Sequence, residues 1–145
     1  MKFICLGFQD ESSGTKMSQS ERKFFMEQCF AYDAELRRGG HFLGGEALQP
    51  ARNAATVRCQ SEKVMVTDGP YAETKEQLGG ILFLEARDLD QAIQRMAQHP
   101  GVRTGGFEIR PANEEINAWI AARKPSPTSP NHREAEFLLK QRSNR

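Results

Sequence analysis

The chain has 145 residues and a formal charge of +1, and 38% of its residues are hydrophobic. That length fits one globular domain with a single core, and the composition excludes collagen, coiled coil and disorder for the chain as a whole. The near-zero charge gives no electrostatic reason to expect direct binding of nucleic acid. The charge is divided unevenly, with −3 in residues 1–122 and +4 in residues 123–145. The basic extension either contacts an acidic partner or is simply solvated.

The cysteines and the apolar runs bear on the compartment. Cys5, Cys29 and Cys59 are an odd, widely spaced set, unlike the dense even set of a small secreted scaffold. No apolar run approaches the length of a transmembrane helix, and the apolar start is too short for a signal peptide. We therefore expect a cytoplasmic protein with no membrane partner.

The first part of the chain predicts a strand followed by a long helix. Residues 3–8 are apolar on both alternating faces, which is typical of a central strand covered on both sides. Ser18 and Glu21 have the spacing of a capping box, in which a hydroxyl and a carboxylate satisfy free N–H groups at a helix start. One face of this helix carries apolar side chains at helical spacing: Phe25, Cys29, Tyr32 and Leu36. Gly39-Gly40 ends it.

The middle of the chain predicts mostly β-structure. Residues 44–50 hold two glycines and a proline, which favours a loop or an irregular edge strand. Residues 55–60 and 63–67 are rich in Val and Thr around a polar pair, and they predict a β-hairpin. Residues 81–84 form a continuous apolar strand, introduced by Gly79-Gly80.

A second helix and a last strand follow. Asp88 can cap a helix with one face formed by Leu89, Ile93, Met96 and Ala97. His99 precedes Pro100 at the end of this helix, where we expect it to complement the helix dipole as a C-cap residue. Residues 107–110 alternate like a half-exposed strand.

This order of elements predicts the fold. Two helices interleaved with about five strands form an α+β, ferredoxin-like α/β sandwich, with an antiparallel sheet and two main helices on one face. The strands that are apolar on both faces need a second cover, which a second copy of the sheet in a homodimer would supply.

The C-terminal part differs in kind. Asn113 can cap a helix that carries Ile116, Trp119 and Ile120 on one face, and residues 124–130 are a Pro/Ser linker. Residues 134–140 predict a final short helix that docks through its apolar residues or frays. We therefore divide the chain into a domain, residues 1–112, and a C-terminal helical extension, residues 113–145.

Several signatures of known chemistry are missing from the sequence. It has no G-x-S-x-G, no G-x-x-x-x-G-K-[ST], no G-x-G-x-x-G after a strand and no C-x-x-C. His41, His99 and His132 are far apart and lack metal-ligand spacing. We therefore expect neither a cofactor nor a metal ion.

The densest group of chemical side chains lies in residues 67–80, between two predicted strands. Asp68 would stand at the end of a strand beside a turn fixed by Gly69 and Pro70. Partial desolvation would suit its carboxyl group to general acid or base chemistry. The structural alternative is that Asp-Gly-Pro is good turn chemistry, with the aspartate accepting backbone N–H groups.

A second candidate region lies around His41. This histidine precedes the glycine-rich run Gly44-Gly45-Glu46, where the backbone can approach a ligand closely. The alternative is an exposed loop histidine. With Asp68 as the catalytic candidate, the candidate substrate-binding residues are His41, Gly44, Gly45, Glu46, Gly69, Pro70, Tyr71, Glu73 and Lys75.

Residues 66–80, together with residues 44–50 and 108–111, resemble the sequence blocks of the YCII-related, or DGPF-domain, family. The resemblance covers about residues 1–112 and implies a dimeric α+β barrel, in which the sheets of two subunits pack face to face. Related YCII-like proteins include a dehydrochlorinase, and a histidine and an aspartate have been suggested as active-site groups there. The wider superfamily holds cofactor-free isomerases and monooxygenases. Some DGPF-domain proteins occur beside extracytoplasmic-function sigma factors.

The sequence departs from that family in two places. Tyr71 stands where the family often has phenylalanine, and Cys29 stands where many members carry a histidine on the first helix. For a His–Asp pair, His41 or Tyr71 would have to substitute. Otherwise the site is a binding pocket without that chemistry.

Two functional hypotheses follow. The first is a cofactor-free lyase or isomerase that acts on a small organic ligand, with Asp68 as the acid or base and Glu46 or Lys75 orienting an ionic group. The second is a non-catalytic ligand-binding or regulatory module whose partner is linked to sigma-factor-dependent transcription. A cavity beside Asp68 would favour the first hypothesis.

Overall fold

The structure is a computed structural model, and it describes residues 1–13, 16–123 and 138–142. The chain divides into two compact units. One unit comprises Met1–Thr56 and Asp68–Ala112, and the other comprises Val57–Thr67 and Asn113–Arg145. The predicted division at residue 112 stays a prediction.

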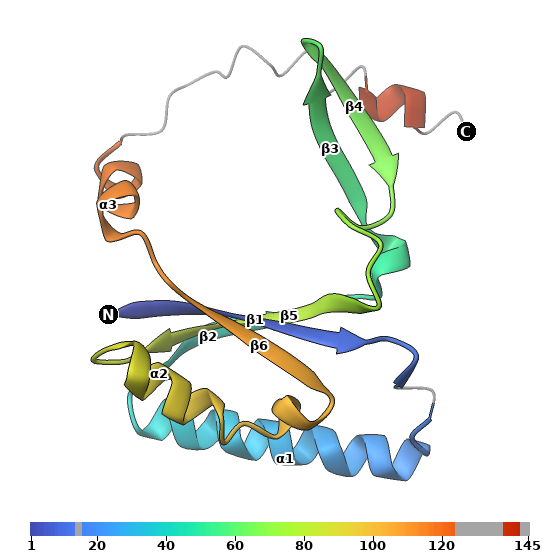
Figure 1. Ribbon diagram of the computed structural model, residues 1–145. Coiled ribbons are helices and arrows are strands. Elements are labelled where there is room, and N and C mark those ends of the chain that lie inside the picture. Colours follow the sequence, from blue (N-terminus) through green and yellow to red (C-terminus); the bar gives the residue numbers. More distant parts are fainter. Residues whose placement is uncertain (14–15, 124–137, 143–145) are drawn as a thin grey trace. The chain divides into compact units, whose positions relative to one another are not determined.

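The first unit is built on a four-stranded antiparallel sheet (Figure 1). Its strands are β2 (Phe42–Ala47), β5 (Glu76–Glu85), β1 (Lys2–Asp10) and β6 (Gly105–Pro111), in that spatial order. The apolar strand β1 pairs with both β5 and β6, so it is the central strand that its sequence predicts. The predicted ferredoxin-like α+β fold is confirmed by this strand order and by the placement of the helices.

Both helices of this unit lie on the same face of the sheet (Figure 1). The predicted capping box of α1 (Gln19–Arg38) is present, because the Ser18 hydroxyl accepts the Glu21 N–H while the Glu21 carboxylate accepts the Ser18 N–H. The helix ends at Gly39, and Gly40 has a φ of +75°, which favours glycine. As predicted, Asp88 caps α2 (Leu89–Met96) by accepting the Gln91 N–H.

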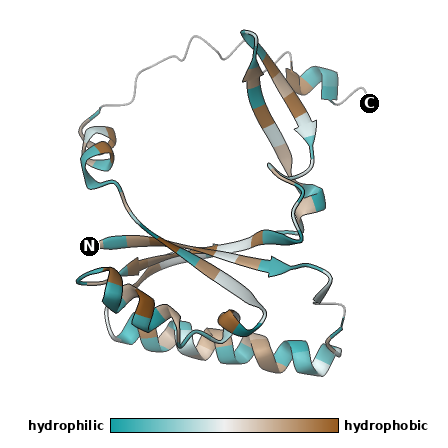
Figure 2. Cartoon of the chain, viewed as in Figure 1, coloured by the Kyte–Doolittle hydropathy of each residue, from teal (hydrophilic) through white to brown (hydrophobic). Residues whose placement is uncertain are grey.

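The core lies between these helices and the inner face of the sheet. Two rows of side chains across β1 and β5 fill it, since Phe3 pairs with Leu84 and Cys5 pairs with Leu82. Their helical partners are Leu36, Ala92 and Met96. Phe3 and Leu84 are fully buried, so the core is tightest at this end of the sheet. In Figure 2 the sheet strands and α2 carry hydrophobic segments, while α1 is largely hydrophilic.

The outer face of the sheet is also apolar. Ile4 pairs with Phe83 and Leu6 pairs with Ile81, and all four side chains are half-buried. Because neighbouring residues of a strand point to opposite faces, these four lie on the face away from α1 and α2. Among the described residues of this unit, no helix covers that face.

The second unit contains most of the predicted hairpin and a third helix. Strands β3 (Ala55–Gln60) and β4 (Lys63–Asp68) are joined by Ser61 and Glu62, which both have positive φ, as a two-residue hairpin turn requires. Asn113 caps α3 (Glu114–Ala122) as predicted. The apolar residues of this helix are exposed: Ile116, Trp119 and Ile120.

Some predicted elements differ in extent or lie outside the structure. Strand β5 begins at Glu76, so residues 76–80 of the predicted loop 67–80 are part of this strand. On α2 the buried positions are Ala92 and Met96, whereas Leu89 and Ile93 are exposed. Residues 138–142 are helical, and the linker 124–130 and residues 134–137 lie outside the described residues. Over the part of the chain described here, no helix has the length and hydropathy to cross a membrane.

Candidate functional site

A row of small residues leaves a hollow under one end of α1. Across the sheet, Phe107 pairs with Gly7, Gly7 with Gly80, and Gly80 with Ala47. A Cβ atom added to Gly7 would lie 3.1 Å from the Phe107 ring, so this row points to the helix-covered side of the sheet. In the neighbouring row, Leu82 and Cys5 fill the space between the sheet and the helices. In this row the residues of β1, β5 and β2 carry little or no side chain, so they leave that space open.

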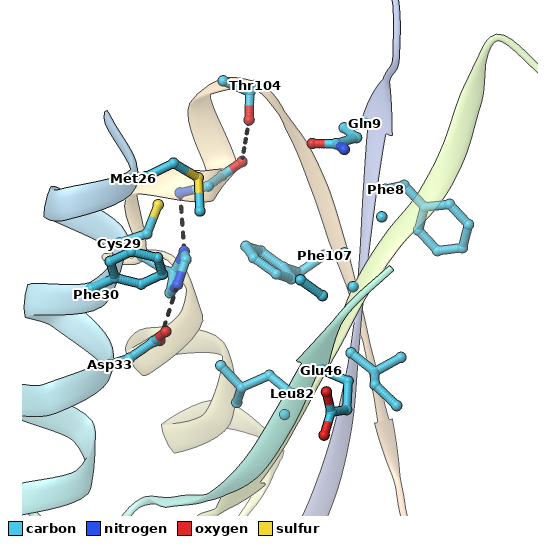
Figure 3. A pocket seen from close by; sticks show the side chains of 18 of the residues that line it. Phe8, Gln9, Met26, Cys29, Phe30, Asp33, Glu46, Leu82, Thr104 and Phe107 are labelled. Carbon is cyan, nitrogen blue, oxygen red and sulfur yellow. Dashed lines mark hydrogen bonds and ion pairs between the residues drawn. The ribbon is translucent and has the colours of Figure 1, made fainter. Parts of the chain in front are cut away.

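The hollow is a cavity of about 350 Å³ between α1 and the sheet (Figure 3). A volume of this size suits a small organic molecule. Helix α1 and strand β6 supply several of its apolar residues: Phe25, Met26, Cys29, Phe30 and Phe107. In Figure 3, Asp33 reaches from α1 toward the sheet, and Gln9 reaches from β1 toward the helix.

Asp33 and His99 form a pair at the wall of this cavity. The His99 Nε2 atom lies 3.3 Å from Asp33 Oδ1. The His99 side chain is 9% exposed, whereas that of Asp33 is 27% exposed. The carboxylate is therefore the more accessible member of the pair, and the histidine lies behind it.

The other contacts of His99 fix its orientation. Its Nδ1 atom accepts the Gly101 N–H at 3.0 Å, so in the neutral ring the hydrogen is on Nε2 and points at Asp33. Tyr32 and Phe107 pack edge-to-face on the imidazole, with ring centroids 5.6 and 5.2 Å away. With both nitrogen atoms engaged, His99 positions the Asp33 carboxylate rather than acting directly on a ligand.

The role predicted for His99 was therefore wrong. This histidine does not cap the C-terminus of α2. Its side chain accepts an N–H group at the start of the next helical turn, η3 (Pro100–Arg103). The reason is that Pro100 begins η3, and the imidazole of the preceding residue is then in place to accept the free N–H of Gly101.

Two further lining residues are polar. Burial raises the pKa of the Cys29 thiol, and the negative charge of Asp33 raises it further, so this thiol is protonated at neutral pH. The Gln9 amide packs against Gly79, where an added Cβ atom would lie 2.7 Å from its nitrogen. A side chain on Gly79, at this bulge of β5, would displace the Gln9 side chain.

The predicted residues around His41 fall into two groups. His41 itself bonds to the Glu85 carbonyl through Nδ1 at 2.8 Å and does not line the cavity. Gly44 lies beside Phe83, on the outer face. Gly45 and Glu46 do line the cavity. Glu46 pairs with Ile81, so its carboxylate leaves the sheet on the outer face and its backbone forms the cavity wall.

The predicted residues of the 67–80 segment lie elsewhere. Asp68 ends β4 and is exposed. Gly69 has a φ of +110°, its N–H donates to the Ala54 carbonyl, and its own carbonyl accepts from the Thr56 hydroxyl. These two bonds hold the backbone at Gly69, where the positive φ favours glycine. The predicted acceptance of backbone N–H groups by the Asp68 side chain stays a prediction. The remaining candidates of this segment, Pro70, Tyr71, Glu73 and Lys75, are half-buried or exposed and do not line the cavity.

The site residues predicted from the sequence do not include Gln9, Asp33 or His99, which all line the cavity. Asp33 had a usable signal, since it follows Cys29 by one helical turn and so shares the inner side of α1. His99 had none, because its approach to Asp33 depends on how η3 packs against α1. Within the described ranges, no three His, Cys, Asp or Glu side chains are grouped so as to hold a metal ion.

The fold and cavity define a ferredoxin-like α+β domain with a small-molecule-sized pocket on its helical side. Comparison with known proteins gives the family. The sequence-family model of the YCII-related domain matches residues 1–116, so the chain belongs to the YCII-related family. It is also 33% identical over 113 residues to an uncharacterised protein of Rhizobium meliloti (strain 1021), covering 77% of this chain and 91% of that protein.

Proposed function

We propose that this chain binds a small, largely apolar organic molecule in the cavity under α1 and exchanges a proton with it through Asp33. The observation that carries the proposal is a carboxylate held by a buried histidine at the wall of an aromatic-lined cavity. A positioned carboxylate can accept and return a proton without a cofactor. The reaction class is therefore the cofactor-free lyase or isomerase type.

The occupancy of the cavity is tested by filling it. Ala47 lies in the small-residue row, so Ala47→Leu places extra methyl groups in the hollow. Ala55 is also an exposed strand residue, outside the cavity, and Ala55→Leu is the matched control. Ligand-observed NMR with a set of aromatic alcohols, ketones and amines should show binding to the wild type and to Ala55→Leu, with loss in Ala47→Leu. Equal binding to all three proteins would contradict the proposal.

The identity of the acid or base is tested by paired variants. Asp33→Asn keeps the shape of the side chain and removes its proton-acceptor chemistry. For any compound of that set that reacts or exchanges hydrogen with D₂O, we expect Asp33→Asn to lower the rate about a hundredfold or more. The role predicted for Asp68 is tested by Asp68→Asn in the same assay. A large loss of rate in Asp68→Asn, with no loss in Asp33→Asn, would assign the role of acid or base to Asp68.

We also propose that the chain is a homodimer formed through the outer face of the sheet. The support is the apolar face formed by the Ile4–Phe83 and Leu6–Ile81 pairs, which another sheet could cover. Light scattering should give a dimer for the wild type and for Lys23→Glu, an exposed control on α1 at the opposite face of the sheet, and a monomer for Leu6→Glu. A monomeric wild type would contradict the dimer. The cytoplasmic location and a sigma-factor-related partner stay predictions.

A further inference from the structure

We propose that the cavity selects molecules that carry a positively charged amine on an apolar body, over neutral and anionic molecules of the same shape. This inference rests on the proposed function and names the substrate class of the same site. Its basis is the set of charged and donor groups that face the cavity.

The charge that faces the cavity is negative. Asp33 contributes a carboxylate from α1, and the lining residues of the described chain include no lysine and no arginine. The nearest basic residue along α1 is Arg37, whose guanidinium lies over the Phe42 ring at 4.5 Å from its centroid. It is not part of the lining. An anion would therefore meet a like charge without a compensating cation.

The side-chain donors of the cavity are largely engaged. The Thr104 hydroxyl donates to the Gly101 carbonyl, and the Nε2–H group of His99 faces Asp33. Among the described lining side chains, this leaves the Gln9 amide and the weakly donating Cys29 thiol for an anionic ligand. The carboxylate or phosphate of a ligand would lose its hydration without gaining enough hydrogen bonds.

A cation finds the opposite situation. An ammonium group placed at Asp33 makes a charge-assisted hydrogen bond in a partly desolvated site. The rings of Phe30 and Phe107 line the same cavity and can add cation–π attraction, while they also pack against the apolar body of the ligand. Charge, hydrogen bonding and apolar contact therefore favour the same class of molecule.

The test compares three molecules of one shape: benzylamine, benzyl alcohol and benzoate, titrated by calorimetry at pH 7. We expect benzylamine to bind about tenfold more tightly than benzyl alcohol, because hydrogen bonds to charged groups are the stronger ones. Benzoate should bind more weakly than either. Asp33→Asn should abolish the preference for the amine.

Two controls separate charge in the cavity from charge elsewhere. Glu27 lies on the exposed side of α1, and Glu62 is exposed in the turn between β3 and β4; neither lines the cavity. Glu27→Gln and Glu62→Gln remove the same charge as Asp33→Asn and should keep the preference for benzylamine. Loss of the preference in either control variant would overturn the assignment to Asp33.

The outcomes also separate this inference from the proposed function. If benzyl alcohol or benzoate binds the wild type as tightly as benzylamine, amine selectivity is wrong and the cavity remains a small-molecule site. If none of the three binds, both the inference and the proposed function fail. If Asp33→Asn does not fold, the order of affinities of the wild type and the two glutamine variants still decides the question.

Discussion

The cavity under α1 and the loop that begins at Asp68 belong to the same compact unit, yet they use acidic residues in different ways. The cavity holds one carboxylate among aromatic rings, oriented by a buried histidine. The loop holds several exposed charged groups around a turn fixed by its backbone. The acidic group of the cavity is thus oriented by a buried side chain, whereas the backbone of the loop is held by its own hydrogen bonds.

The largest difference between the two regions should be in stability. Leu84 is fully buried in the core, so Leu84→Ala should lower the free energy of unfolding by about 2–5 kcal/mol. Glu73 is exposed in the loop, and Glu73→Ala should change it by less than about 0.5 kcal/mol. Urea denaturation measures both. Similar losses would contradict the assignment of the core to the helix-covered face.

The next effect concerns the residue that orients the carboxylate. His99→Ala leaves the Gly101 N–H without its acceptor and Asp33 without its donor, so we expect a loss of about 1–3 kcal/mol. The affinity for benzylamine should also fall, because the carboxylate is no longer fixed. Denaturation and calorimetry measure these effects. An unchanged affinity would show that His99 is structural only.

Two glycines, one in the cavity wall and one in the loop, differ in what a side chain would meet there. At Gly45 an added Cβ atom would lie 2.8 Å from the Ile81 carbonyl oxygen, so Gly45→Ala must shift the backbone of the cavity wall. At Gly69 nothing lies within 4 Å, but φ is +110°, and Gly69→Ala should cost about 1–3 kcal/mol through backbone strain alone. Only Gly45→Ala should weaken benzylamine binding. An equal effect of Gly69→Ala would connect the loop to the site.

The smallest effect is chemical. Burial raises the pKa of the Cys29 thiol and raises that of Cys5 to about 11, so both are mostly protonated at pH 8, and only the thiolate is alkylated. Iodoacetamide should modify the exposed Cys59 first, and the rate at Cys29 should rise as the pH increases above 8. Benzylamine should slow the alkylation of Cys29 and leave that of Cys59 unchanged, and mass spectrometry measures both rates. Equal rates at pH 8 would contradict the burial of Cys29.

Much of the fold could be predicted from local patterns. The capping residues Ser18 and Asp88, the two-sided apolar strand β1 and the hairpin each depend on residues close in sequence, and the structure confirms them. The cavity could not be predicted in the same way. It arises because Gly7, Gly80 and Ala47 meet across three strands, and sheet register is set by the whole fold.

The candidate site shows the same limit. The glycine-rich run 44–46 predicts close approach of the backbone to a ligand, and Gly45 and Glu46 of this run line the cavity, whereas Gly44 does not. The Asp33–His99 pair joins residues 66 positions apart, and the sequence near His99 predicts only a role at a local helix end. The contact between His99 and Asp33 is created by tertiary packing, so the residues near His99 in the sequence do not predict it.

We place the ligand chemistry in the cavity under α1 and not at the Asp68 loop. The most direct measurement is a ¹H–¹⁵N NMR titration of the wild-type protein with benzylamine. We expect the largest shift changes at backbone amides of the cavity wall, among them Asp33, Gly80 and Gly101, with residues 68–75 unchanged. Changes concentrated in residues 68–75, with none at the cavity wall, would contradict the claim.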